Sequence, residues 1–405
     1  MVLKVLYTAG PGNAFQTFRM WARGEHDLVV SHVGYSRQMY EALARHGAAA
    51  RITCTYADDD EQNFGGISVV RRPDPSQGRS GLAFHRSLYQ KARMNMRDAL
   101  DFGANVVIIG EDTIPAHYAP LRRRGVTVVQ ALHTRLWRED RPLSLMQRLR
   151  MRGYRKGYSN GATPVLSSSD AVTAQVERLA GAGATPIVEF LPLYHTDHYS
   201  GLPAPDLDAT RLQIMFIGRV EPSKGALDLV EIARRLLAQG VDFGFHICGI
   251  GGALDEMQAM VAQQGLTDRF VFHGWCDRSA LRHVMTQCHV SIVPTRADFI
   301  EGFNQIVVES VLSGRPAVAS SVCPAVNYVG GAVDIVPADD VAGYAAALAA
   351  LDRDRAGLAA RIAACGPAGA RFMDAANSFG SALDEVFDAW RERRPIRDRR
   401  IAAAA

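Results

Sequence analysis

The fold is decided by Leu212-Gln-Ile-Met-Phe-Ile-Gly-Arg-Val-Glu-Pro-Ser-Lys-Gly225, which leads directly into an amphipathic segment at 227–237. The apolar start predicts a buried strand, the middle a loop with two glycines and two cations, and the following segment a helix. Strand, loop and helix in this order form the repeating unit of a parallel sheet covered by helices.

The same alternation continues through both halves of the chain. In the second half, strand-like runs lie at 213–217, 243–248, 270–272, 290–293, 317–320 and 334–336. In the first half they lie at 3–7, 50–56, 106–109, 127–130 and 164–167. We therefore predict an α/β chain of two Rossmann-like domains, with ligands at the carboxyl ends of the strands and in a cleft between the domains.

The chain's 405 residues suit two domains. Proline-rich, polar sequence at 195–210 marks the boundary between them. The predicted division is residues 1–200, residues 201–372, a helix at 373–395 that packs across the domains, and a frayed tail at 396–405.

Composition excludes some classes of partner and location. The net charge is only +3, so nothing calls for nucleic acid. The six cysteines form no metal-binding spacing, and no signal-peptide pattern or membrane-spanning apolar run is present. These features predict a cytoplasmic protein, either free or peripheral at the inner face of the membrane.

Basic residues concentrate between Arg122 and Lys156, where eleven Lys or Arg stand against Glu139 and Asp140 alone. Within this block, 141–156 alternates cations with apolar residues. It is interpreted either as an amphipathic helix on an anionic membrane or as a core-facing helix with a charged outer side. An anionic glycan acceptor is a third partner consistent with it.

Two glutamates frame the segment Glu301-Gly-Phe-Asn-Gln-Ile-Val-Val-Glu309. If residues 302–312 form one helix, the carboxylates lie about 12 Å apart along its axis. A glycosidase acid/base pair needs about 5–10 Å, so the two are better suited to holding opposite ends of one elongated ligand. N–H groups near Phe303 and Asn304 would lie between them, at the helix start. The alternative is two exposed glutamates at a helix N-terminus.

The loop 218–225 carries Arg219 and Lys224 five residues apart, after a strand. Arginine binds a diphosphate bidentately and lysine adds a compact charge. The order of a Walker loop is absent. The alternative is a basic surface turn.

Together, Gly218–Gly225 and Glu301–Glu309 resemble the motifs of the retaining family 4 glycosyltransferases, the glycosyl transferases group 1 of the GT-B fold. Supporting segments stand in order between them at 248–252, 271–275 and 290–295. The second domain resembles the family along its whole length, the first only in outline.

The resemblance implies roles for individual residues. Arg219 and Lys224 would neutralise the leaving diphosphate, Glu301 would contact hydroxyls of the transferred sugar, and Glu309 would bind the ribose. His133 resembles the active-site histidine near the donor sugar, with a purely structural role as the alternative. The remaining donor-binding positions implied are Gly10, Gly12, Gly218, Gly249, His273, Trp275, Gly302, Phe303 and Asn304.

The sequence departs from the family at two places. Asn304 stands where glycine is frequent, and residues 193–197 replace the usual Asn-Gly-Val-Asp segment. Asn304 is expected to reach the sugar or phosphate, and Tyr194 or His195 to replace an interdomain contact.

The implied activity is retaining, metal-independent transfer from a UDP- or GDP-sugar to a hydroxyl of a glycan or lipid-linked acceptor, in bacterial polysaccharide or glycoconjugate synthesis, with no cofactor. The alternatives are a sugar phosphorylase and a catalytically silent partner subunit on the same fold. Two further patterns are weaker. Asp58-Asp59-Asp60 suggests a metal site but is better interpreted as a solvated turn, and Gly249–Gly252 lacks the third glycine of a dinucleotide fingerprint.

Overall fold

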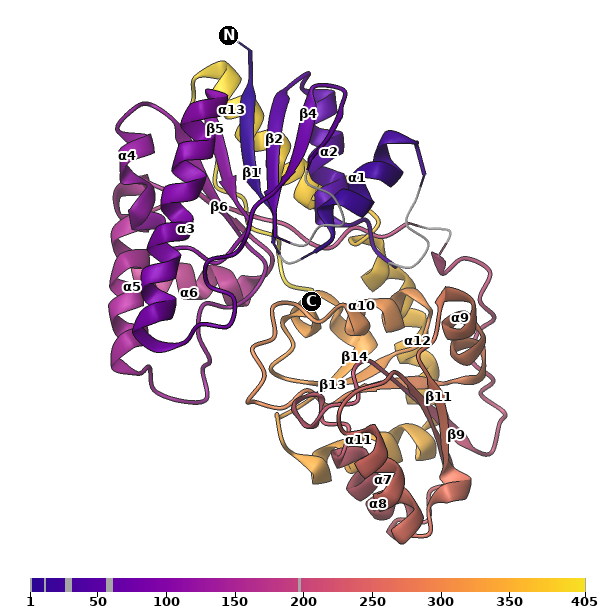
Figure 1. The fold of residues 1–405 in the computed structure, drawn as a ribbon. Coiled ribbons are helices and arrows are strands. Elements are labelled where there is room, and N and C mark those ends of the chain that lie inside the picture. Colours follow the sequence, from indigo (N-terminus) through magenta and orange to yellow (C-terminus); the bar gives the residue numbers. More distant parts are fainter. Residues whose placement is uncertain (1, 11, 26–30, 56–60, 196–197, 405) are drawn as a thin grey trace. The chain divides into compact units, whose positions relative to one another are not determined.

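The computed structural model describes residues 2–10, 12–25, 31–55, 61–195 and 198–404 (Figure 1). The chain divides into two compact units. The first contains Met1–Leu193 and Ala375–Ile401, and the second contains Tyr194–Asp374 and Ala402–Ala405. Each unit has its own sheet and its own hydrophobic core.

The first unit is built on an eight-stranded sheet of order β3-β4-β2-β1-β5-β6-β7-β8, in which only β3 is antiparallel to its neighbour. Its strands are β1 Lys4–Thr8, β2 Ala49–Cys54, β3 Glu61–Phe64, β4 Ile67–Arg71, β5 Val106–Ile109, β6 Thr127–Leu132, β7 Val165–Ser167 and β8 Ile187–Glu189. Its helices are α1 Ala14–Ala22, α2 Tyr35–Arg45, α3 Gly81–Phe102, α4 Ala119–Arg122, α5 Leu145–Tyr158, α6 Asp170–Ala180 and α13 Phe379–Glu392.

Strand β1 shows why helices cover both faces of this sheet. Val5 and Tyr7 belong to the core cluster that includes residues of α2 and α13, whereas Leu6 packs in the cluster that includes residues of α3. Successive side chains of a strand point to opposite faces, so an apolar run is buried only if both faces are covered.

The second unit has a six-stranded parallel sheet of order β11-β10-β9-β12-β13-β14. Its strands are β9 Leu212–Ile217, β10 Phe243–Cys248, β11 Phe270–Gly274, β12 Val290–Val293, β13 Ala317–Ser320 and β14 Val333–Val336. Its helices are α7 Asp228–Ala238, α8 Leu254–Gln263, α9 Arg278–Gln287, α10 Gln305–Leu312, α11 Val341–Arg353 and α12 Arg355–Ala370. In β9, Leu212, Ile214 and Phe216 pack in one core cluster, and Met215 packs in another.

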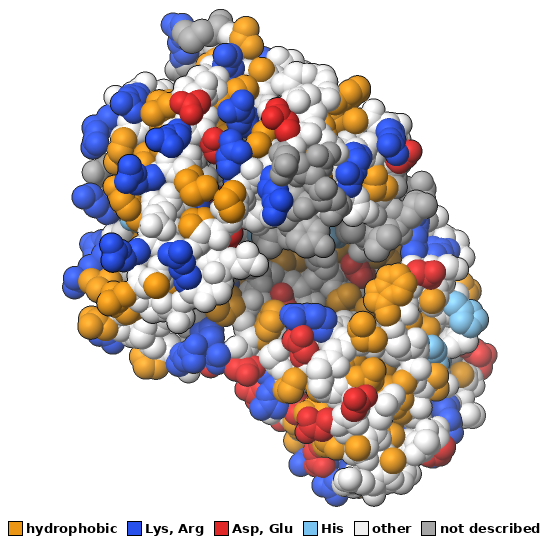
Figure 2. Space-filling model, in the orientation of Figure 1, with side chains coloured by type: hydrophobic (Ala, Val, Ile, Leu, Met, Phe, Trp, Pro, Cys, Tyr) orange, Lys and Arg blue, Asp and Glu red, His pale blue; other side chains and the backbone are white. Residues whose placement is uncertain are grey.

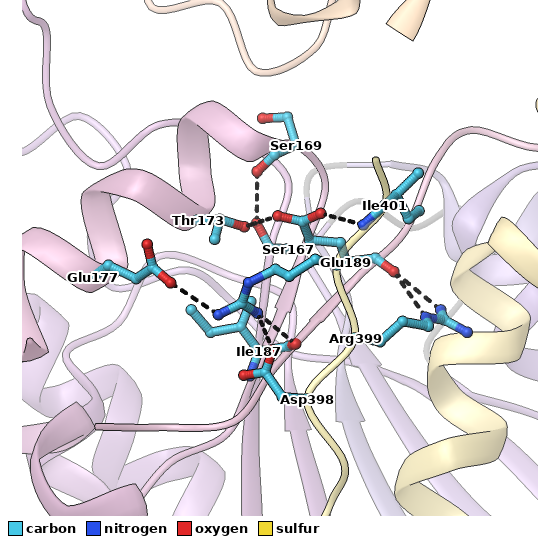
Figure 3. A network of polar contacts seen from close by, with 10 residues as sticks. Ser167, Ser169, Thr173, Glu177, Ile187, Glu189, Asp398, Arg399 and Ile401 are labelled. Atoms are coloured by element: carbon cyan, nitrogen blue, oxygen red, sulfur yellow. Dashed lines mark hydrogen bonds and ion pairs between the residues drawn. The ribbon is translucent and has the colours of Figure 1, made fainter. Parts of the chain in front are cut away.

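The segment after Pro395 corrects the expectation of a frayed tail. Arg399 forms a parallel bridge with Val188 of β8, and its guanidinium donates to the carbonyl oxygen of Glu189 (Figure 3). The N–H of Ile401 donates to the buried Glu189 carboxylate at 2.7 Å. In the second unit, Ala404 donates to the carbonyl of Asn327. The tail is therefore held by hydrogen bonds along an otherwise open sheet edge.

The helix expected at 373–395 corresponds to α13, which spans Phe379–Glu392. Helix α13 belongs to the first unit, where Asp384 pairs with Arg45 and His46 of the α2 region. In the part of the chain that the structure describes, every helix is too short or too polar to span a bilayer.

Candidate functional site

The predicted donor-binding residues of the second unit lie at one edge of its sheet. Arg219 and Lys224 follow β9, Gly249 follows β10, Trp275 follows β11, and Glu301 follows β12. Because these strands are parallel, their carboxyl ends share an edge. The chain moves outward from β9 to β11 and returns at β12 on the other side of β9, so the switch point lies between β9 and β12. Open α/β sheets bind ligands at such a point.

A charge pair spans this switch point. Lys224 ends a short 3₁₀ helix, η4 (Pro222–Lys224), and its Nζ lies 2.7 Å from Oε2 of Glu301. Only 19% of the lysine side chain and 11% of the glutamate side chain are exposed. The ammonium also lies 3.7 Å from the ring centroid of Phe299. The loops after β9 and β12 are thus joined by a largely desolvated ion pair.

The side chain of Asn304 contacts the Glu301 carboxylate of this pair. Its Nδ2 lies 3.0 Å from Oε2 of Glu301 and 3.3 Å from Oγ1 of Thr295. Its backbone is left-handed, with φ of 75°, and it stands at the N-cap of α10. Among the described atoms, its buried Oδ1 has no hydrogen-bond partner. These hydrogen bonds within the protein hold the Glu301 carboxylate in place. They do not test the expected contact of Asn304 with a sugar or phosphate.

Arg219 occupies a more open position than Lys224. Its Nη1 lies 2.8 Å from Glu221, and 58% of its side chain is exposed. Its guanidinium carbon lies 6.0 Å from the centroid of the Phe299 ring. Phe299 therefore lies beneath both cations, a role that the sequence motifs do not signal.

Glycine is required where two of these loops approach each other. A Cβ on Gly249 would lie 1.8 Å from the carbonyl oxygen of Gly218, and Gly249 has φ of 153°. Its N–H donates to the carbonyl of Gly274 at 2.7 Å. The backbones after β9, β10 and β11 therefore come together in a way that any side chain at this position would prevent.

The expected helix at 302–312 begins later than predicted. Helix α10 starts at Gln305, so Glu301, Gly302 and Phe303 lie in the preceding loop. The expected separation of about 12 Å between the Glu301 and Glu309 carboxylates assumes one continuous helix. This assumption is wrong, because Glu301 lies outside α10. Glu309 lies within α10 and is buried, with 6% exposed. This burial also excludes the alternative of two exposed glutamates.

Strands β10 and β11 carry a histidine pair, His246 and His273, of which His246 is buried, and the exposed Trp275 directly follows β11. Nδ1 of His246 lies 3.1 Å from Nε2 of His273, and Nε2 of His246 lies 3.2 Å from Oε1 of Gln213. Burial and the neighbouring His273 lower the pKa of His246 to about 4, and burial lowers the pKa of His273. Both rings are therefore neutral near pH 7. Trp275 is 64% exposed at the same edge.

In the first unit, His133 follows β6 and is surrounded by aromatic rings. Its ring centroid lies 4.4 Å from Tyr35 and 5.5 Å from each of Phe190 and Phe379. Burial lowers the pKa of His133 to about 4. Its Nδ1 has no hydrogen-bond partner among the described atoms. Any chemistry here is that of a neutral imidazole.

Gly10 and Gly12 lie in the loop after β1. A Cβ on Gly10 would lie 3.2 Å from the carbonyl oxygen of Gly110, whereas one on Gly12 would meet nothing within 4 Å. Pro11, between them, lies outside the described residues. Gly10 thus lies against the loop after β5, at the switch point of the first sheet.

That switch point carries a carboxylate which the sequence interpretation missed. Glu111 lies 2.6 Å from Nδ2 of Asn95 and 3.2 Å from Nζ of Lys91, which also pairs with Asp74. Burial raises the pKa of Glu111, although Lys91 opposes the shift. The sequence signal for this residue is a carboxylate two positions after the apolar run of β5.

The acidic run Asp58–Asp60, which suggests a metal site in the sequence, lies outside the described residues. Within the described residues, no three His, Cys, Asp or Glu side chains gather in a way that could hold a metal ion.

Comparisons with known proteins identify the second domain. A family model described as glycosyl transferases group 1 matches residues 211–354, from the start of β9 through α11. In this domain the chain is similar to the group 1 glycosyltransferases. The 2-deoxystreptamine glucosyltransferase of Streptomyces kanamyceticus is 36% identical over 117 residues, which are 29% of this chain and 30% of that protein. Against the first curated relatives, the match thus spans about a third of their length.

Solved structures resemble the whole chain. Sucrose-phosphate synthase from Thermosynechococcus elongatus has a TM-score of 0.69 at 16% identity, over 96% of this chain and all of that one. HepE of Anabaena, in complex with UDP, has a TM-score of 0.64 at 15% identity with the same coverage. At these identities the likeness concerns the fold, and the chain has the GT-B fold of two Rossmann-like domains.

Proposed function

We propose that this protein transfers a sugar from a nucleoside diphosphate sugar to a hydroxyl group of an acceptor. The observation that carries the proposal is the Lys224–Glu301 pair at the switch point of the second sheet. A sugar nucleotide needs a cation for its diphosphate and an acceptor of hydroxyl hydrogen bonds for its sugar. The pair supplies both at the edge where an open α/β sheet binds ligands.

In this proposal, Lys224 and Arg219 stabilise negative charge that develops on the leaving diphosphate. The positive end of α10, which starts at Gln305, lies at the same edge and favours the same charge. Because these groups supply the counter-charge, we propose that transfer needs no metal ion. We also propose retention by front-face attack of the acceptor hydroxyl, with Glu301 holding the sugar.

The remaining donor contacts follow the family pattern. We assign Glu309 to the ribose hydroxyls and the backbone near His273 and Trp275 to the edge of the base. His133, which is neutral near pH 7, is assigned to a hydrogen bond with the donor sugar rather than to a charged contact. The UDP complex of the structural neighbour HepE favours UDP, with GDP as the second candidate.

The acceptor is proposed to be a glycan or a lipid-linked glycoconjugate. The first unit holds 31 Lys or Arg against 22 Asp or Glu, whereas the second holds 14 against 20. Figure 2 shows basic and apolar side chains interspersed over the first unit. The charge excess suits an acceptor or a surface that carries negative charge.

Helix α5 is the element of the first unit that suits such a partner best. It buries Met151, Tyr154 and Tyr158, so it is a core-facing helix. Its outward side carries the exposed cations Arg148, Arg152 and Lys156, and Leu145 and Leu149 are also exposed. We propose that this side attracts an anionic membrane surface or an anionic acceptor.

A ligand screen and two variants test the proposal. In thermal-shift assays, UDP or GDP should stabilise the protein more than ADP does, because a ligand that binds only the folded state stabilises it by mass action. Glu301→Ala and Lys224→Ala should each lower turnover by about 100-fold or more. Glu256→Ala, an exposed glutamate of α8 in the same unit, is the control.

The outcome separates the competing functions. Release of a nucleoside diphosphate together with a new glycoside supports transfer. Release of a sugar phosphate that requires inorganic phosphate would identify a phosphorylase. Nucleotide binding without turnover on any acceptor would favour a silent partner subunit, and near-normal turnover in both alanine variants would refute the assigned site.

A further inference from the structure

A pocket of about 630 Å³ opens in the first unit, at the sheet edge opposite to His133 and Gly10. Thr127, which lines it, begins β6, and Pro164 and Pro186 directly precede β7 and β8. The pocket therefore lies at the amino ends of these strands. Ligands of open α/β sheets bind at the carboxyl ends, so this pocket is separate from the site described above.

Four segments of the chain build the pocket. One is residues 119–128, covering α4 and the start of β6, and two others are the residues just before β7 and the residue just before β8. The fourth is Arg394, Pro395 and Ile396, the start of the tail that continues along β8. Arg394 is fixed by Glu385 and Glu392, each with a contact of 2.6 Å. The tail wall is thus held in place by charges outside the pocket.

The charge of the lining is unbalanced. Arg122, Arg123 and Arg394 line the pocket, and no Asp or Glu appears among its described lining residues. The Nη1 of Arg122 donates to two neutral acceptors, the carbonyl of Pro115 at 3.0 Å and the hydroxyl of Thr163 at 2.9 Å. Burial and the adjacent Arg123 both lower the pKa of Arg122. An anion placed here would stabilise the charged form of Arg122 against both its burial and its repulsion from Arg123.

The other walls are largely apolar, being formed by Val126, Pro164, Pro186, Pro395 and Ile396. The volume falls in the range of ordinary small-molecule sites, about 300–1,000 Å³. Paired guanidinium groups match phosphate oxygens in charge and geometry.

We propose that this pocket binds a phosphate monoester that carries an apolar group. The phosphate lies against Arg122 and Arg123, and the organic group lies against the prolines and Ile396. Because the tail forms one wall, the bound ligand also stabilises the tail along β8. This site does not depend on the donor site of the second unit.

The test uses phenyl phosphate as the probe on the full chain, with inorganic phosphate and phenol as comparisons. Phenyl phosphate should raise Tm more than either comparison compound and should slow hydrogen exchange in segments 119–128 and 394–401. Arg123→Ala, which removes an exposed side chain, and Arg122→Ala should each weaken binding about tenfold or more. Arg124→Ala is the matched control, because Arg124 is exposed and adjacent but does not line the pocket.

Several results would overturn the proposal. They are an absence of stabilisation by phenyl phosphate, equal weakening by Arg124→Ala and Arg123→Ala, and loss of binding in Lys224→Ala, which would place the probe at the donor site. A vesicle-binding experiment distinguishes the two sources of the ligand, a lipid headgroup and a soluble metabolite. Vesicles containing phosphatidic acid should bind the protein in an Arg123-dependent way if the monoester belongs to a lipid, and should not if it belongs to a soluble metabolite.

Discussion

Breaking the Lys224–Glu301 pair on one side should destabilise the second unit strongly, and breaking it on both sides should cost less than the sum of the two single changes. Removing one member of a buried ion pair costs about 3–5 kcal/mol, because the other charge is left without a partner. Both side chains retain some exposure, 19% and 11%, so the expected cost of Lys224→Met or Glu301→Gln is about 2–3 kcal/mol. In the double variant no charge remains, so the coupling should be about 1–2 kcal/mol.

The assay is urea unfolding of the full chain, with the second unit followed by hydrogen exchange in peptides covering β9 and α10. The matched control is the same cycle at Glu231 and Arg234, an ion pair on the surface of α7 with contacts of 2.8 and 3.0 Å. Exposed pairs couple by less than about 1 kcal/mol. If the Lys224–Glu301 cycle couples no more strongly than this control, the charges are not held together in the folded protein and the proposed preformed site is refuted.

Three further predictions concern other parts of the chain. Burial depresses the pKa of His133 from 6.5 to about 4, so the unfolded state binds the proton first and the first unit should lose up to about 3 kcal/mol as pH falls from 6.5 to 4. His133→Leu should flatten this pH dependence in denaturant unfolding, and parallel curves would contradict the assignment. Gly249→Ala should destabilise the second unit by more than about 2 kcal/mol, because its Cβ would lie 1.8 Å from a carbonyl oxygen, whereas Gly252→Ala has open space and should be near neutral in the same measurement. Deleting residues 398–404 should speed hydrogen exchange in β8 and lower stability by about 1–3 kcal/mol, since the buried Glu189 carboxylate loses the Ile401 N–H; unchanged exchange would show that the tail does not hold this edge.

The periodic apolar runs made the core of the fold predictable. The expected runs at 243–248, 290–293 and 317–320 coincide with β10, β12 and β13, because both faces of these strands are covered and their side chains, except that of His246, are apolar or small. Strand β3, with the sequence Glu-Gln-Asn-Phe, was missed because an exposed antiparallel edge strand needs no apolar pattern. The docking of Arg399 on β8 was missed because it depends on pairing between residues more than 200 apart, which no local pattern encodes.

The donor site was predictable in its residues but not in its contacts. Motif spacing identified Lys224 and Glu301, yet their pairing across 77 residues follows from strand order and not from sequence distance. The start of α10 was misplaced because Gly302 and Phe303 do not oppose a helix strongly. The tertiary contacts of Asn304, with its left-handed backbone, end the helical turn before it can extend to Glu301.

Asn304 combines two roles: it tolerates the left-handed backbone, and its amide holds the Glu301 carboxylate. Glycine, which is frequent at this position in the family, can fill only the first role. The φ of 75° at Asn304 favours glycine or asparagine, and the Asn304 amide holds the Glu301 carboxylate at 3.0 Å. Asn304→Gly should therefore keep the backbone and lose the amide contact, whereas Asn304→Ala should lose both and cost about 1–2 kcal/mol more. If the amide positions Glu301 for the donor sugar, Asn304→Gly should weaken binding of the sugar nucleotide more than binding of the free nucleoside diphosphate. Calorimetric titration with both ligands measures this difference, and equal weakening of the two would show that Asn304 supports the loop as a whole and does not act through Glu301.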